Sequence, residues 1–496
     1  MFIQVFYPII FSLVLIIIIR FQKLFHIPGL KKWDLNLAFL IKISSSLFYL
    51  FVFDVLFGKG MLAFDSLQYF IDGKILNEVF YKSPKSYFHI LTGFGESLEM
   101  VEYYLNETGK WFYSVTFFLD DSKNIIRICS LIEFFARNSF FIYFIVFDII
   151  SLLGIYYLTK TIYKLTTLNV RFVFFGILLL PNLLFWSSGI LKESPLILGF
   201  ALFFYSLYFL KKNNFKRIFL FVLSLFLLIA FKPYLLLILI IALIIFAIKE
   251  FGKMSYLLSV FLFLTSFILL NLFQPEIRKK ITRTISFKQH DFINIGRGGI
   301  YCRDTNTNVA FNIAPKYYSY FTTDSMQNIK INKKIHIFQL NRYQKIIDPI
   351  TIDTNSTIKL KVCSFYVKSN SYIKVTPISS SFKQLMLNIP EAFINANFRP
   401  FPFDVGKKFR IPAFIETFLL FSFLFISIYF RKKLNTKEKN IVFILSIFAV
   451  FLSILIGWTT PVLGAIIRYR IPVYLSILLI SFILIDKNKL WKKNIS

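Results

Sequence analysis

Cysteine and histidine are scarce in this chain of 496 residues, and their scarcity limits the kinds of site it can hold. The 4 histidines are scattered without the spacing of metal ligands, so a structural zinc site is not supported. Two of the 3 cysteines, Cys302 and Cys363, fall in one segment and could form a disulfide, which would leave Cys129 alone.

Acidic residues are also few. The 26 Asp and Glu are outnumbered by 57 Lys and Arg, which gives a net charge of +31. A nucleic-acid partner is disfavoured all the same, because 56% of the residues are hydrophobic and 65 of them are Phe. Membrane lipids are the better partner, since anionic lipid attracts basic residues that flank apolar segments.

Long apolar runs, in contrast, are abundant. Many segments are apolar over roughly the length that an α-helix needs to cross a bilayer. The sequence therefore predicts a mainly α, polytopic bundle of transmembrane helices. About eleven spans are expected, at residues 2–19, 35–57, 139–158, 172–190, 195–210, 218–231, 235–248, 255–273, 412–430, 441–458 and 471–485.

The orientation of this bundle follows from the Lys and Arg content of its loops, because short basic loops stay in the cytoplasm. With the N-terminus outside, the predicted cytoplasmic loops and tail hold 22 Lys and Arg, whereas the short loops on the opposite side hold 4. The C-terminus is then cytoplasmic. The first span is not expected to be a cleaved signal peptide, since its charges follow the apolar run.

Three parts make up the predicted chain. Residues 1–273 form a transmembrane bundle whose long outside loop, 58–138, has the helical spacing of short amphipathic helices on a membrane surface. Residues 274–411 alternate apolar and polar side chains and predict a small β-rich extracytoplasmic domain. Residues 412–496 form the C-terminal transmembrane helices and a cytoplasmic tail.

Carboxylates at the ends of the spans are the candidate catalytic residues. Asp65 follows the second span, where a general base could deprotonate an acceptor, and Tyr69 is expected to contact substrate nearby. Glu193 lies in a polar interruption between two apolar runs, where it could act as a second carboxylate, orient a sugar or help to coordinate a divalent cation. No metal ligand set and no certain cofactor is predicted.

Four cations complement these carboxylates on the same predicted side of the membrane. Lysine and arginine side chains at helix ends can hold a phosphate, which arginine binds through two hydrogen bonds. An enzyme that faces outward has no ATP, so its donor must arrive activated, as a polyprenyl-phosphate-linked sugar does. The predicted substrate-binding cations are Lys192, Lys232, Arg468 and Arg470.

Structural roles compete with these functional ones. Lys192, Lys232 and Arg468 could be interfacial anchors, and Asp65 could cap a helix. Charged residues within spans are costly in lipid and should face the bundle interior as structural partners of one another. These residues are Lys42, Asp54, Asp148 and Glu416.

Several motifs in this order resemble the GT-C class of membrane glycosyltransferases. They are FDSLQYFIDG, LPNLLFWSSGILKES, AFKPYLLL and RYRIPVYLSILL, within roughly residues 35–250 and 412–485. The resemblance implies a multi-span enzyme that uses a polyprenyl-phosphate-linked sugar. It also implies that Asp65 matches the catalytic acidic position, with the four cations near the lipid phosphate.

Departures from the class refine this expectation. Ser66 follows Asp65 where an acidic pair is common, the span 2–19 is extra, and the insert 274–411 lies within the bundle. FRPFPFD (398–404) resembles a feature of bacterial envelope-polysaccharide membrane proteins. The function expected is transfer of a sugar to a lipid, glycan or protein acceptor on the outer face of the bacterial inner membrane. The alternatives are a polysaccharide polymerase or ligase, and a non-enzymatic transporter or assembly scaffold.

Overall fold

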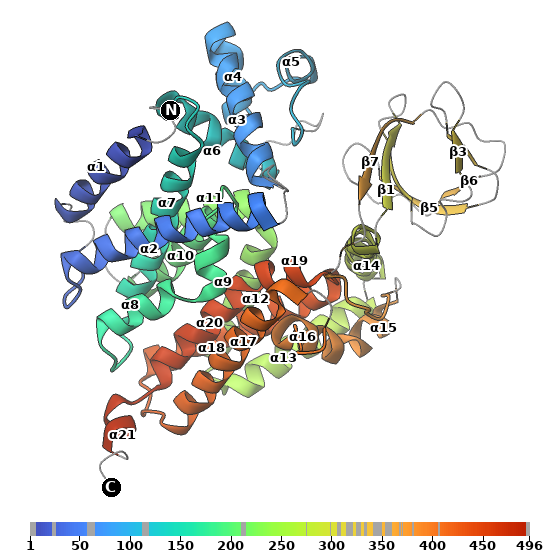
Figure 1. Cartoon of the computed structure of the whole chain (residues 1–496). Coiled ribbons are helices and arrows are strands. Elements are labelled where there is room, and N and C mark those ends of the chain that lie inside the picture. The colour runs from blue at the N-terminus through green and yellow to red at the C-terminus, as the bar shows by residue number, and fades with distance from the viewer. Residues whose placement is uncertain are drawn as a thin grey trace. The chain divides into compact units, whose positions relative to one another are not determined.

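The chain folds into a mainly helical structure, shown as a computed structural model in Figure 1. The structure describes residues 6–21, 26–56, 65–111, 119–209, 215–273, 275–297, 299–304, 309–313, 321–323, 329–331, 335–340, 350–352, 360–366, 369, 371–378, 381–404 and 407–492. Two compact units are present. The first contains Met1–Ile244, Leu419–Phe448 and Tyr474–Ser496, and the second contains Ile245–Phe418 and Ala449–Val473.

The first unit is built from the N-terminal helices and parts of the C-terminal ones. Its helices up to residue 231 are α1 (Tyr7–Phe21), α2 (Lys32–Phe51), α3 (Asp65–Lys82), α4 (Pro84–Thr92), α5 (Leu98–Tyr104), α6 (Asp121–Ala136), α7 (Phe140–Ile162), α8 (Val170–Leu178), α9 (Pro181–Trp186), α10 (Glu193–Phe209) and α11 (Phe215–Phe231). A π-helical turn, Val52–Leu56, continues α2. Helix α21 (Lys487–Lys492) also belongs to this unit.

Helix α7 lies at the centre of this unit, packed against α2 and α10 (Figure 1). Gly154 allows the close approach of α7 and α10, because an added Cβ would lie 2.9 Å from Ile197 Cγ2 and 3.0 Å from the Leu198 nitrogen. The facing side chains Ile155, Leu158 and Phe200 are buried. Because lipid is as apolar as these side chains, the close van der Waals packing that Gly154 permits, and not transfer out of water, is the main stabilising contribution here.

Helices α3 and α6 form a second close pair in the loop that follows α2. A Cβ at Gly73 would lie 2.4 Å from Cys129 Cβ, so only glycine permits this separation. Asp120 caps α6 by accepting hydrogen bonds from the backbone nitrogens of Ser122 and Lys123. The helices α3, α5 and α6 occupy the stretches for which the sequence predicted short helices, and that prediction of helices is confirmed.

The second unit combines helices with a strand-rich segment. Four helices contain residues of both units: α12 (Pro233–Phe251), α17 (Lys407–Tyr429), α18 (Thr436–Thr459) and α20 (Ile471–Leu484). Its own helices are α13 (Tyr256–Phe273), α14 (Pro275–Arg297), α15 (Phe382–Leu387), α16 (Ile389–Phe398) and α19 (Leu463–Tyr469).

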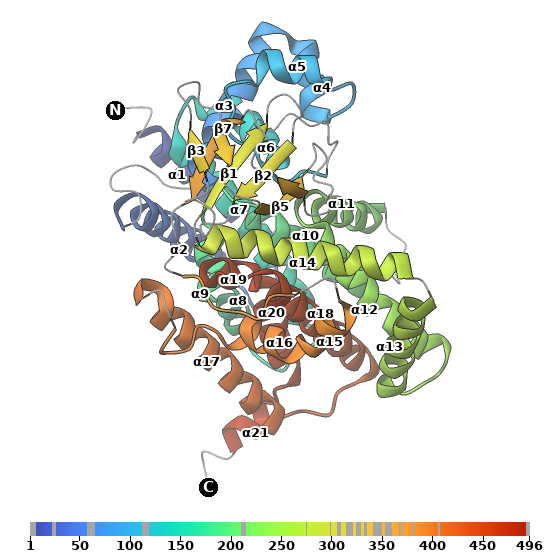
Figure 2. The same ribbon diagram turned by 90° about the vertical axis from the view of Figure 1, so that its right-hand side faces the viewer.

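The described strands are β1 (Gly299–Asp304), β2 (Val309–Ile313), β3 (Phe321–Thr323), β4 (Ile329–Ile331), β5 (Ile335–Leu340), β6 (Ile350–Ile352) and β7 (Leu360–Tyr366). Five of them form an antiparallel sheet in the order β6-β5-β2-β1-β7, and β3 pairs with β4. Figure 2 shows β1 between β2 and β7. The predicted β-rich segment, 274–411, is not strand-rich throughout, because α14 and the helices α15 and α16 occupy its two ends.

The prediction of eleven spans is also wrong for the described residues. Five helices are long and apolar enough to cross a membrane, and a sixth span results if α19 and α20, bent by 47°, count as one. The five are Lys32–Leu56, Phe140–Ile162, Pro233–Phe251, Ile411–Tyr429 and Thr436–Thr459.

Short helices account for much of the difference. The predicted span 172–190 is two helices, because Pro181 starts α9 and holds Leu180 out of the helical conformation. Helices α10 and α11 have 17 residues each and α1 has 15, whereas about 20 residues cross the hydrocarbon core.

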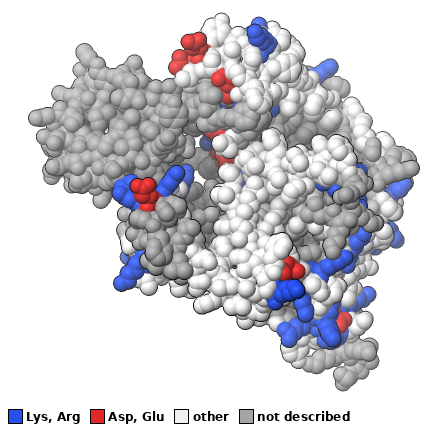
Figure 3. Space-filling model, turned by 180° about the vertical axis from the view of Figure 1, so that it is seen from behind, with Lys and Arg blue, Asp and Glu red and all other residues white. Residues whose placement is uncertain are grey.

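Exposed apolar side chains agree with a membrane environment. Ile10, Leu13 and Ile17 are exposed along α1, and Phe418, Leu419 and Phe425 along α17. Figure 3 shows large stretches of uncharged surface among the described residues, with Lys and Arg gathered in separate places. Several long apolar helices with exposed apolar faces make this a membrane protein.

Candidate functional site

The first helix after α2 places a carboxylate beside a lysine. Asp65 is the first residue of α3, and its Oδ1 lies 3.0 Å from Lys110 Nζ. Both side chains are about one third exposed, at 34% and 35%. Burial lowers the pKa of Lys110, but the charge and hydrogen bond of Asp65 outweigh it, so the net shift is upward. Asp65 is thus accessible to solvent and close to a protonated amine.

A second carboxylate on α3 holds the backbone at Lys110 in place. Asp72 is buried two turns after Asp65, and its oxygens accept hydrogen bonds from the Gly109 nitrogen at 2.9 Å and the Lys110 nitrogen at 2.7 Å. Gln68 Nε2 donates a third hydrogen bond at 2.7 Å. Burial raises the pKa of Asp72, while these hydrogen bonds lower it in part. Asp72 therefore fixes Lys110 relative to its own helix.

The next residue, Trp111, is anchored as well. Its ring lies 4.9 Å from Lys123 Nζ and 5.2 Å from the Arg127 guanidinium carbon, and its Nε1 donates to Glu96 at 3.3 Å. Cations over an aromatic face are attracted by the ring quadrupole. Glu96 also pairs with Lys123 at 3.6 Å and with Arg127 at 3.5 Å, all buried. The segment 109–111 is therefore rigidly held on both sides of Lys110.

Lys192 approaches the same group of residues from the segment before α10. Its Nζ lies 2.8 Å from Asp121 Oδ1 and 3.2 Å from Ser122 Oγ, at the start of α6. The same Nζ lies 5.9 Å from the centre of the Tyr69 ring, and the Tyr69 hydroxyl lies 3.4 Å from Ser122 Oγ. The positive charge of Lys192 also acts on Lys110 and opposes the upward shift of its pKa. Lys192 therefore joins α3 and α6 in one polar group.

These residues form what is here termed the α3–α6 cluster: Asp65, Tyr69, Lys110, Asp121, Ser122 and Lys192. It contains two carboxylates and two ammonium groups, so its formal charge is balanced. Asp121 is 40% exposed and Lys192 is 15% exposed. Each lysine is already paired with a carboxylate, so a phosphate that binds here has to displace Asp65 or Asp121 from its lysine.

Two other predicted site residues, Glu193 and Lys232, form a buried ion pair. Lys232 Nζ lies 3.4 Å from Glu193 Oε1, and the side chains are 6% and 1% exposed. Breaking such a buried pair costs several kcal/mol, about 3–5. The pair joins the start of α10 to the end of α11, so its position favours a structural role for both residues.

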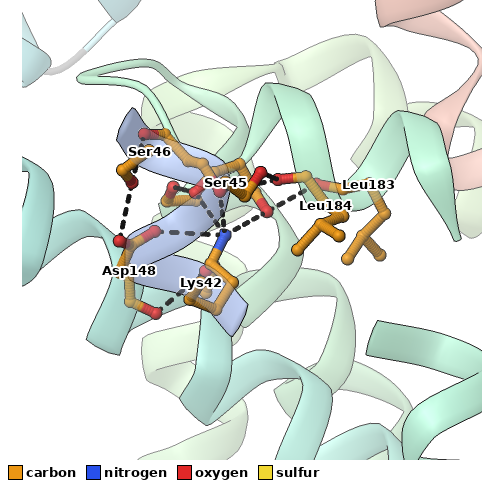
Figure 4. Close-up of polar contacts among 10 residues, drawn as sticks. Lys42, Ser45, Ser46, Asp148, Leu183 and Leu184 are labelled. Carbon is orange, nitrogen blue, oxygen red and sulfur yellow. Dashed lines mark hydrogen bonds and ion pairs between the residues drawn. The ribbon is translucent and has the colours of Figure 1, made fainter. Parts of the chain in front are cut away.

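A buried network holds the segment that carries Lys192 and Glu193 (Figure 4). Lys42 Nζ donates to the Ser187 carbonyl, Ser187 Oγ and Ser188 Oγ, each at 2.9 Å, and pairs with Asp148 at 3.3 Å. Ser46 Oγ lies 2.7 Å from Asp148 Oδ2 and 2.8 Å from the Ser188 carbonyl. Backbone carbonyls outside a helix need such donors at membrane depth.

This network confirms that Lys42 and Asp148 face the interior and pair with each other, as their cost in lipid predicted. Glu416 is buried as well. Ser194 Oγ also donates to the Ser187 carbonyl at 2.8 Å, so α10 begins from an anchored turn. The buried pair thereby fixes the backbone from which the Lys192 side chain reaches Asp121.

Arg468 and Arg470 belong to the second unit, so the predicted meeting of all four cations stays a prediction. Arg470 is fully buried, donates to the Arg399 carbonyl, and lies 3.3 Å from Thr417 Oγ1. Arg399 in turn pairs with Asp404 at 2.7 Å. The motifs FRPFPFD and RYRIP, distant in sequence, therefore contact each other in the second unit.

The sequence missed several members of the α3–α6 cluster. Lys110 has no neighbouring pattern that marks it, and the adjacent Asp120 and Asp121 are typical of a solvated turn. A weak signal exists in the buried Asp72, since an acidic residue on the apolar face of a helix needs donors from another segment.

Metal binding finds no support in the described part of the chain, where no three His, Cys, Asp or Glu side chains lie close enough to hold an ion. Comparisons with models of protein families, with curated proteins and with solved structures gave no match to this chain.

Proposed function

We propose that this chain is a GT-C type glycosyltransferase of a bacterial inner membrane. It moves a sugar from a polyprenyl-phosphate carrier to a lipid, glycan or protein acceptor on the outer face. In this proposal the N-terminus, residues 58–138 and the segment 274–411 lie outside, and the C-terminus is cytoplasmic. This orientation requires the 15-residue α1 to cross the membrane together with Lys32–Leu56. The Lys and Arg distribution of the loops supports that orientation.

The observation that carries the proposal is the accessible Asp65 carboxylate within the α3–α6 cluster. A base and two phosphate-binding cations are what transfer from a sugar phosphate requires. Asp65 would take the proton of the acceptor, while Lys192 and Lys110 stabilise the charge that develops on the leaving phosphate. Asp121 keeps Lys192 in place until the donor arrives.

Supporting roles fall to residues that do not reach solvent. Tyr69 orients Ser122 and Lys192 through its hydroxyl and ring. Glu193 and Lys232 position the start of α10, and Arg470 ties the RYRIP motif to FRPFPFD.

The test is the change Asp65→Asn in the full-length protein, reconstituted in vesicles with a panel of polyprenyl-phosphate hexoses. Loss of a general base should lower sugar transfer by on the order of 10²-fold or more. Asn still starts a helix well, so the fold should be unaffected. Glu107→Gln, an exposed acid outside the cluster, is the matched control and should transfer sugar at the wild-type rate.

Transfer by the Asn variant at the wild-type rate would remove Asp65 from the chemistry. If the folded wild-type protein releases no polyprenyl phosphate from any donor of the panel, the glycosyltransferase proposal itself fails.

A further inference from the structure

Helix α16 packs against α18, a helix of membrane-spanning length, near the end at which α18 stops (Figure 1, Figure 2). The two backbones touch at Gly457, where an added Cβ would overlap the Ala392 carbonyl oxygen. One turn further into α18, Ser453 Oγ donates a hydrogen bond to Asn397 Oδ1 at 3.1 Å. Helix α16 therefore runs along α18 and descends beside it from Ala392 to Asn397.

The depth of this contact follows from helix geometry. Ser453 precedes the end of α18 at Thr459 by six residues, which is about 9 Å along the helix axis. Helix α18 has 24 residues, whereas about 20 cross the hydrocarbon core, so only about two residues at each end of a centred α18 extend past the core. Ser453 and its partner Asn397 then lie within the hydrocarbon layer.

Arg399, the residue that follows α16, gives a second measure of depth. Its carbonyl oxygen accepts a hydrogen bond from Arg470 Nη1, and Arg470 Nη2 lies 3.3 Å from Thr417 Oγ1. Thr417 is six residues into the apolar span that starts at Ile411, which is again about 9 Å. Because α17 and α18 are consecutive spans, Ile411 and Thr459 lie on the same side of the membrane. Both measures therefore place the end of α16 at a similar depth in one leaflet.

The turn between α16 and α17 has the hydrogen bonds that such a depth requires. Arg399 Nη1 pairs with Asp404 Oδ1 at 2.7 Å, and Arg399 Nε donates to Asn395 Oδ1 at 2.8 Å. Asp404 Oδ2 accepts a hydrogen bond from the Phe401 nitrogen at 2.7 Å. Backbone outside a helix is tolerated at membrane depth where other parts of the protein satisfy its polar groups. Residues 399–404 meet this requirement with partners from α16, from the turn itself and from Arg470.

Large apolar side chains of this segment are exposed. Ile394 of α16 is 45% exposed, and Phe403 in the turn is 81% exposed. The Phe403 ring stacks on the ring of Phe401, with the ring centres 5.4 Å apart. Apolar surface of this kind is unfavourable in water and favourable among acyl chains. The exposed spans on either side indicate the same surroundings, since Phe418 of α17 is 62% exposed.

We infer that α16 and the turn 399–404 form a re-entrant segment. It enters the leaflet beside α18 and leaves it on the same side through the start of α17. Ile394 and Phe403 contact lipid acyl chains within that leaflet. Because the segment does not cross the bilayer, the proposed sides of the flanking spans are unchanged. The inference is independent of the proposed transferase activity, since none of its residues belongs to the α3–α6 cluster.

Spin labels on single cysteines measure this position directly. The full-length protein, with its native cysteines replaced, is reconstituted in vesicles of phosphatidylcholine and phosphatidylglycerol and labelled at Ile394→Cys or Phe403→Cys. The experiment compares collisions of the label with oxygen, which concentrates in lipid, and with a nickel chelate, which stays in water. The ratio of oxygen to nickel collisions should be several-fold higher at both positions than in Glu107→Cys, which changes an exposed acid outside the spans.

Phe425→Cys is the matched control for contact with lipid, because Phe425 is 68% exposed within the span of α17. Ratios at Ile394→Cys and Phe403→Cys close to that of Phe425→Cys would support the re-entrant segment. A ratio as low as that of Glu107→Cys at either position would overturn it. Slow collisions with both reagents would show that another part of the protein covers these side chains, which would overturn their contact with lipid.

Discussion

Lys42 is the residue whose surroundings differ most from those of an ordinary lysine. Its ammonium group is fully buried and has four partners, namely Asp148, the Ser187 carbonyl and two serine hydroxyls (Figure 4). A charge at membrane depth is tolerated only with such complete pairing. The network does more than pair Lys42 with Asp148. It also supplies hydrogen-bond donors to the backbone carbonyls of Ser187 and Ser188.

Lys42→Met is therefore expected to destabilise the protein by about 3–5 kcal/mol, since it leaves Asp148 buried without its cation. The double change Lys42→Met with Asp148→Leu should recover part of this loss by removing the second charge. Unfolding of the purified protein by denaturant in detergent would measure both. A double variant less stable than the single one would contradict a paired role, and Lys74→Met on α3 serves as the control.

At the residue scale, the sequence identified charged side chains that are costly to place in lipid whatever their partners are. Lys42 and Asp148 stand out because charge is rare in apolar runs. Lys110 does not stand out in the sequence, since it lies among other polar residues. Its place in the cluster depends on the hydrogen bond between its backbone nitrogen and Asp72. Asp65 was predicted as a base, yet its lysine partner depends on a contact over 45 positions of sequence.

At the scale of elements, the predicted spans and the observed helices differ mainly in length. Hydropathy counts apolar residues and does not register where a helix stops. The run 172–190 is mostly apolar, yet Pro181 divides it into α8 and α9. Helices themselves were predictable, because their apolar periodicity is local. Whether they span a membrane depends on breaks of one or two residues, which composition does not reveal.

The close pairing of α3 and α6 predicts that Gly73→Ala is harmful. The new methyl group would overlap Cys129 and force the helices apart, at a cost of about 1–3 kcal/mol. Tyr69 and Ser122 would separate with them. We therefore expect both a lower unfolding midpoint and weaker donor binding in Gly73→Ala.

Gly464→Ala is the matched control, because a Cβ at that glycine meets nothing within 4 Å. It should leave the midpoint nearly unchanged. A wild-type midpoint for Gly73→Ala would show that the two helices can separate without loss.

Strand register gives a prediction for the cysteines. Cys302 of β1 and Cys363 of β7 are directly opposite each other in the antiparallel pair. Opposite positions on neighbouring antiparallel strands have Cα atoms about 4.5–5.5 Å apart, within the range of about 4.4–6.8 Å that disulfides span. If this segment faces an oxidising compartment, mass spectrometry of non-reduced peptides should detect the Cys302–Cys363 bond.

Cys129 provides the internal comparison for that experiment. It is buried between α3 and α6, and burial raises the pKa of its thiol well above the usual value. It should therefore stay reduced and react slowly with alkylating reagents. Free thiols at all three positions would contradict the predicted location of the strands.

At the scale of the whole molecule, the orientation in the membrane can be tested directly. Single cysteines at Glu107 and Asn488, both exposed, lie on opposite sides in the proposed topology. With the native cysteines replaced, an impermeant maleimide should label Glu107→Cys in intact cells and Asn488→Cys only after lysis. The reverse pattern would invert the orientation and place the α3–α6 cluster in the cytoplasm.

Composition predicted the class of molecule, and charge bias predicted an orientation, because both properties add up over the whole chain. Contacts between distant motifs were not predictable in this way. FRPFPFD and RYRIP attracted attention separately, and only the fold brings Arg470 to the Arg399 carbonyl. Lateral position in a helix bundle depends on packing, which a single sequence does not encode locally.

The pairing of Lys42 also has a consequence for the order of events during synthesis. Ser187 and Ser188 leave the ribosome 145 and 146 residues after Lys42. Helix α2 must therefore enter the membrane with an unshielded lysine and wait until α7 and α9 have been made. During that interval it should remain beside the insertion machinery or its chaperones, so the nascent chain has a built-in delay between insertion and assembly.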